Sequence, residues 1–274
     1  MLVKNWLLVS TLLLAPVLAS AQPIPVQVNV SGDTATIDVG GVGQSLADIT
    51  LTFDDASGLT AASLGVSAQL VSLTDPQLLA RLPSVDTSLD GALPLLVTIE
   101  PPALGGLSFD RTVRVDLHTH ALVYTVGSSY RLFKAPLGGA FRDITDEIAP
   151  GSVRARGTTG GFSQFLVLAD VRETGSVVQQ KFDWLRARID AAPATERPPL
   201  LAQLDAAEDA VAIEDYAAAM ASLDAIRAHA AARAGKGLQD QWRATRDADN
   251  EAGEIISGAA TLKFSIAYLR DFGQ

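Results

Sequence analysis

The residues best suited to chemistry in this chain form a short His-x-His segment, Asp116-Leu117-His118-Thr119-His120. Side chains alternate between the two faces of a strand, so Asp116, His118 and His120 should project from one face while Leu117 turns to the core. Two imidazoles and a carboxylate are ligands that zinc and other divalent metals accept, with one coordination position left open. The alternative is a solvated polar strand face, with Arg114 on the same side.

A second group of candidates is acidic. Carboxylates cluster at residues 143–147 and 54–55, and calcium takes several oxygen ligands of this kind. Neither spacing matches a defined calcium loop. The segment 247–251 is also acidic, but Ala252 stands where such a loop requires glycine. We interpret these segments as turns and as a solvated helix surface.

Composition and missing motifs exclude several other chemistries. The chain has 274 residues with no cysteine, which excludes disulfides, thiolate zinc sites and cysteine nucleophiles. The formal net charge of −10 leaves no surplus of cations to neutralise phosphates, so no nucleic-acid partner is expected. There is no Gly-x-Ser-x-Gly segment, and no phosphate-loop pattern follows the glycines at 40–43. The sequence therefore assigns no catalytic residue.

Short segments with period-two alternation dominate residues 22–172, separated by glycine-rich turns. Such spacing is typical of an antiparallel β-sandwich, and we expect one of immunoglobulin-like type. A short helix is expected to begin near Thr74-Asp75-Pro76. Strands are expected at residues 24–30, 48–53, 95–100, 112–117, 122–126, 130–133, 152–156 and 162–168.

Residues 173–274 are richer in alanine and have apolar residues at helical spacing. Helices are expected from Ser176, from Arg197-Pro198-Pro199 and after Glu214-Asp215, with a fourth running from Leu238 past Trp242. Helices joined by short loops pack as antiparallel hairpins. The last stretch, residues 261–269, fits a strand and a helix equally. The expected class is α+β: a β-sandwich domain followed by an α-helical hairpin bundle.

The first 21 residues are expected to be a secretory signal peptide. Lys4 precedes an apolar run from Trp6 to Leu18, and Ala19-Ser20-Ala21 fits the small-x-small cleavage rule. Cleavage is therefore expected between Ala21 and Gln22. The run is shorter than the roughly 20 residues that a spanning helix needs, and no later segment reaches that length without charge, so no membrane span is expected after cleavage. The expected location is the periplasm or the extracellular medium.

Several segments also carry a resemblance, namely residues 130–134, 139–145, 151–153, 162–165, 201–204, 215–216, 219 and 234–236. The β-rich half resembles a sandwich module of bacterial exported proteins, and the helical half is similar to a small module appended to bacterial secreted proteins. Together they resemble an uncharacterised family of exported bacterial proteins, which implies two modules after export and no particular chemistry.

The sequence therefore favours a non-enzymatic protein of the bacterial envelope, acting as a structural or binding module for a protein or glycan partner. It predicts no cofactor under this interpretation. The alternative is a divalent-metal-binding protein or a metal-dependent hydrolase centred on His118 and His120.

Overall fold

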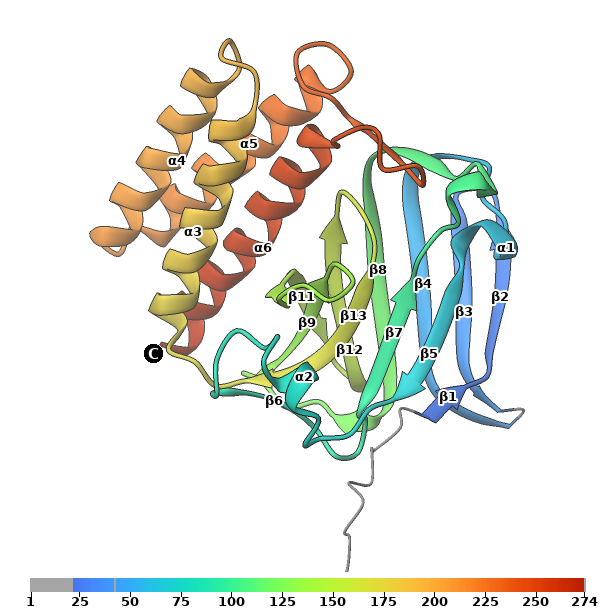
Figure 1. Ribbon diagram of the computed structural model, residues 1–274. Helices are drawn as coiled ribbons and strands as arrows, with labels where there is room; N and C mark the ends of the chain where they lie inside the picture. The colour runs from blue at the N-terminus through green and yellow to red at the C-terminus, as the bar shows by residue number, and fades with distance from the viewer. Residues whose placement is uncertain (1–21, 42, 274) are drawn as a thin grey trace, which may run out of the picture.

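The computed structural model describes residues 22–41 and 43–273 (Figure 1). The predicted signal peptide at residues 1–21 lies outside the described residues. Within the described residues, strands fill most of the chain up to Asp170 and helices most of the chain from Thr174.

Two antiparallel β-sheets of seven strands each form the N-terminal part (Figure 1). The order in sheet A is β1 (Gln22–Ile24), β5 (Val66–Leu70), β7 (Leu95–Ile99), β13 (Gln164–Asp170), β9 (Tyr130–Ala135) and β10 (Arg142–Asp143), with β6 (Thr87–Leu89) paired to β13. The order in sheet B is β11 (Thr145–Ala149), β12 (Ser152–Thr159), β8 (Ser108–Val123), β4 (Gln44–Ser57), β3 (Thr34–Gly41) and β2 (Val26–Ser31), with β14 (Gln241–Arg243) paired to β8. Immunoglobulin domains have seven to nine strands, so the immunoglobulin-like assignment is not confirmed.

The predicted strand 24–30 is divided at Pro25, where the chain passes from β1 in sheet A to β2 in sheet B. Proline has no N–H to donate to a strand ladder, so a sheet is readily interrupted there. The carbonyl of Pro25 still accepts a hydrogen bond, from the amide of Gly40.

The main core lies between the two sheets and is built from inward side chains that recur at every second residue. Examples are Ile37, Ile49, Leu51, Val115 and Val97. A smaller cluster lies on the other side of sheet A and includes Phe133, Leu166 and Phe141. Strands β9 and β13 are thus buried on both faces, which explains their continuous apolar sequence.

Short helical turns connect some strands: α1 (Ala61–Leu64), α2 (Pro76–Leu79) and the 3₁₀ turn η1 (Ala103–Gly105). The helix predicted near Thr74-Asp75-Pro76 is α2, and Asp75 caps it by accepting a hydrogen bond from the amide of Gln77. Aspartate at this position satisfies a backbone donor that the helix cannot.

The C-terminal part is a bundle of four helices: α3 (Thr174–Ala191), α4 (Arg197–Ala212), α5 (Tyr216–Arg233) and α6 (Glu251–Phe272). Its core contains Phe182, Leu204, Leu223 and Leu262, and small alanines such as Ala207 let the helix axes approach closely. The stretch 261–269, for which strand and helix competed, lies inside α6.

The predicted helix from Leu238 past Trp242 is wrong in its first half. Trp242 belongs instead to β14, which adds a strand to β8 in sheet B. Its indole ring stacks on Phe109 and meets Phe162 edge to face in the sandwich core. Burial of the indole among these rings outweighs the weak helical pattern, and α6 begins only at Glu251.

The helical bundle is docked on the sandwich, chiefly through α6, which lies against β8, β11 and β12 (Figure 1). Asn250 caps α6 and donates hydrogen bonds to the carbonyls of Arg111 and Gly160, at 2.6 and 2.9 Å. At Gly253 a β-carbon would lie 2.0 Å from the Arg111 carbonyl oxygen, so only glycine permits this approach.

Buried charges cross the same interface. Glu254 of α6 lies 3.5 Å from the Lys134 ammonium and 2.9 Å from the Arg142 guanidinium. Burial alone would raise the pKa of Glu254, but Lys134 and Arg142 lower it to about 2. Burial lowers the pKa of Lys134 to about 8, against the opposing effect of Glu254. A buried charge left without its partner would strongly destabilise the fold, so these ion pairs hold the bundle against the sandwich.

Candidate functional site

Strand β8 carries the His-x-His segment in the centre of sheet B, between β4 and β12. Leu117 and Thr119 are buried, whereas Asp116, His118 and His120 lie on the opposite face, as the alternation predicts. The antiparallel register places Asp48 of β4 directly beside His118 on one side, and Arg154 of β12 directly beside it on the other.

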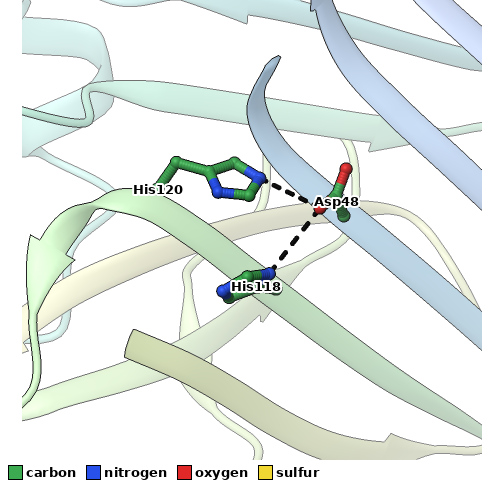
Figure 2. A group of neighbouring side chains, drawn as sticks. All are labelled: Asp48, His118 and His120. Carbon is green, nitrogen blue, oxygen red and sulfur yellow. Dashed lines mark hydrogen bonds and ion pairs between the residues drawn. The ribbon is translucent and has the colours of Figure 1, made fainter. Parts of the chain in front are cut away.

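Asp48 brings a carboxylate to both imidazoles (Figure 2). Its Oδ2 lies 2.9 Å from His120 Nε2 and 3.6 Å from His118 Nδ1. The two rings are edge to face, with their centroids 4.6 Å apart. One ligand atom from each residue lies within 4.8 Å of the others, so these three side chains could hold a single metal ion.

His118 is the more enclosed imidazole, with 17% of its side chain exposed against 37% for His120. Burial lowers its pKa, and the nearby Arg154 adds to this effect, while Asp48 opposes it. The neutral form, which is the form that binds metals, is therefore favoured. The second ring nitrogen, Nε2, lies 2.7 Å from Ser152 Oγ. An outer hydrogen bond of this kind fixes the ring of a metal-binding histidine.

Asp116 faces the same side of the sheet but has another partner. Its Oδ2 accepts a hydrogen bond from Arg156 Nε at 2.7 Å, and it does not belong to the group that Asp48 forms with the histidines. The carboxylate nearest the imidazoles thus comes from β4, seventy residues away in the sequence. Only the pairing of β4 with β8 could have identified it, because Asp48 stands outside any local motif.

The acidic segments have other partners. Asp143 forms a buried ion pair with Lys181 at 2.6 Å, and Asp146 accepts a hydrogen bond from Thr158. Asp54 accepts hydrogen bonds from both the backbone and the hydroxyl of Thr112. Residues 247–250 form an irregular segment before α6, whose first residue is Glu251, so the expected continuous helix surface is not formed here. These contacts give the carboxylates structural roles.

The two distances from Asp48 to the histidines are near those between ligands of a transition-metal ion. Around a tetrahedral zinc with bonds of about 2.0–2.1 Å, ligand atoms lie roughly 3.4 Å apart. The distances of 2.9 and 3.6 Å from Asp48 Oδ2 to the imidazoles bracket this separation. His118 Nδ1, His120 Nε2 and a carboxylate oxygen would occupy three positions and leave a fourth open.

No helix within residues 22–41 and 43–273 has the length and apolar character needed to cross a membrane.

Comparisons with known proteins give a family but no activity. Neither a curated protein nor a solved structure matches the chain. The profile of a family of unknown function, DUF6689, matches residues 9–270, which confirms the expected likeness to an uncharacterised family. The chain belongs to this family of unknown function, DUF6689.

Proposed function

We propose that this protein is a non-enzymatic metal-binding protein that holds a divalent transition-metal ion, such as Zn²⁺, through His118, His120 and Asp48. The observation that carries the proposal is the convergence of three ligand atoms from two paired strands. Metal binding was the alternative interpretation of the sequence, and we now favour it because Asp48 adds a carboxylate beside both histidines.

The donor set favours a transition metal over calcium or magnesium. Imidazole nitrogens suit zinc, copper, iron and nickel, whereas calcium and magnesium prefer oxygen ligands. The outer hydrogen bond from His118 to Ser152 supports the same conclusion, because metal-binding histidines usually have such a partner.

Binding is favoured over catalysis because the group lies on the outer face of a sheet. Half of the Asp48 side chain is exposed, so a bound ion would face water. Catalytic sites gain much of their power by excluding water around the reacting atoms. An ion held on this open strand face is better suited to capture and exchange.

The proposal includes the location and partner expected from the sequence. The apolar run from Trp6 to Leu18 and the small residues at 19–21 support export to the bacterial periplasm or the medium. In that setting the sandwich would act, as immunoglobulin-like modules do, as a rigid platform for an envelope protein or glycan partner.

Zinc titration by isothermal calorimetry tests the metal site. The unmodified chain should bind one equivalent of Zn²⁺, and His118→Ala and Asp48→Asn should each lose most of that affinity. Asp116→Asn should bind normally, because Asp116 is paired with Arg156. His229→Ala, which changes a histidine of α5 paired with Glu196, is the matched control. Failure of the unmodified chain to bind zinc stoichiometrically at micromolar concentration would overturn the proposal.

A further inference from the structure

Arg154 differs from the other arginines on the outer face of sheet B. Arg156 bonds to both Glu147 and Asp116, at 2.6 and 2.7 Å, and Arg114 bonds to Glu147. Arg154 forms no ion pair or side-chain hydrogen bond with any residue in 22–41 and 43–273. Its guanidinium therefore has all of its donors available.

Strand register explains this difference. Arg156 is flanked by Glu147 on β11 and by Asp116 on β8, so an acid stands on each side. Arg154 is flanked by Ala149 on β11 and by His118 on β8. Side chains directly opposite one another on paired strands have β-carbons about 4.5–5.5 Å apart. The available guanidinium thus lies beside the enclosed histidine of the metal group.

Asp38, Asp48, His118 and Arg154 stand side by side on four neighbouring strands, and the charges along this row do not balance once a metal is bound. A divalent ion and Arg154 contribute three positive charges, against the carboxylates of Asp48 and of Asp38, which pairs with Asp48 from β3. One positive charge therefore remains on the strand face that carries both the ion and Arg154. A negatively charged ligand would satisfy both the metal and the guanidinium.

We infer that the metal-loaded protein binds an oxyanion, a carboxylate or a phosphate group, which occupies the open position of the ion and is bound by Arg154. This inference rests on the proposed metal site. A guanidinium presents its N–H donors in a planar fork that matches both groups, and a metal ion accepts an oxygen from either. Such groups occur on acidic glycans, on proteins and on phosphorylated compounds.

Coupling between the two ligands provides the test. The zinc affinity of the full chain should be measured by calorimetry alone, with saturating acetate and with saturating methyl phosphate. We expect one of the two anions to raise zinc affinity at least tenfold, and zinc to raise the affinity for that anion by the same factor. The effective anion decides between carboxylate and phosphate.

Variants separate this inference from the proposed function. Arg154→Gln should still bind zinc but show less than a twofold effect of either anion. Arg154→Lys should retain part of the effect. Arg156→Gln removes the same charge two residues along β12 and should couple as the unmodified chain does. Zinc binding that ignores both anions, or equal coupling in Arg154→Gln, would overturn the inference alone. A chain that binds no zinc would overturn the proposed function and the inference with it.

Discussion

Replacement of Glu254 by glutamine should weaken the docking of the helical bundle in a pH-dependent manner. Glu254 has a pKa of about 2 in the folded protein, against an ordinary value of 4.5. Because the folded pKa is depressed, ionised Glu254 contributes stability above pH 4.5, and this is lost as the pH falls through 2. A shift of this size corresponds to about 3 kcal/mol at pH 7 and to roughly half of that at pH 3.

The loss is limited by the partner that remains. Burial lowers the pKa of Lys134 to about 8 even with Glu254 beside it, so the lysine left without that partner loses its proton more readily. Urea unfolding at pH 7, 5, 4 and 3 measures the free energy of unfolding of Glu254→Gln and the unmodified chain. Glu251→Gln, in the first turn of the same helix, is the control and should cost little. A difference below about 1 kcal/mol at pH 7, or one that does not shrink as the pH falls, would refute this account of the interface.

Three other changes test the packing and the site. Gly253→Ala should lower the free energy of unfolding by about 1–3 kcal/mol, because the added β-carbon would clash with the Arg111 carbonyl oxygen. The control Gly175→Ala, in α3, should stabilise the fold slightly. Equal shifts of the melting temperature in the two variants would contradict this contrast. Trp242→Ala should cost about 3–5 kcal/mol by urea unfolding, and a surface-like loss under 1 kcal/mol would place the indole outside the core. Ser152→Ala should weaken zinc binding about tenfold in calorimetry while Ser152→Thr retains it, and unchanged affinity in both would remove the outer hydrogen bond from the site.

Local patterns predicted the elements whose own residues determine them. The alternation around His118 placed the two histidines on one face of β8, and the prolines placed the beginnings of α2 and α4. The sequence does not predict β3 although Ile37 and Val39 alternate with polar residues, because its last two residues are glycines, which are typical of turns. Short strands such as β5 have too few residues to show a period.

Contacts between distant segments could not be predicted in the same way. Asp48 joins His118 only because β4 and β8 pair in one particular register, and no local residue specifies that register. Asp143 was grouped with neighbouring acids, yet its partner is Lys181 from a helix of the other half. Trp242 stands in a segment with a helical pattern, but its ring packs against Phe109 and Phe162, which are distant in the sequence. The segment therefore forms a strand.

The register that brings Asp48 beside the two histidines is fixed by residues on the opposite face of the sheet. Sliding β4 by one residue against β8 would turn Ile49 and Leu51 from the core to water, and burial of each such side chain stabilises a fold by about 1.5–3 kcal/mol. The residues of the outer face contribute little to this register, because an exposed charge pair stabilises a fold far less than a buried apolar side chain does. Polar residues there can therefore vary with little cost to folding. Ion pairs account for Asp116 and Arg156 on this face, and a hydrogen bond joins Asp48 to His120, whereas only the proposed ligands would give His118 and Arg154 a joint role.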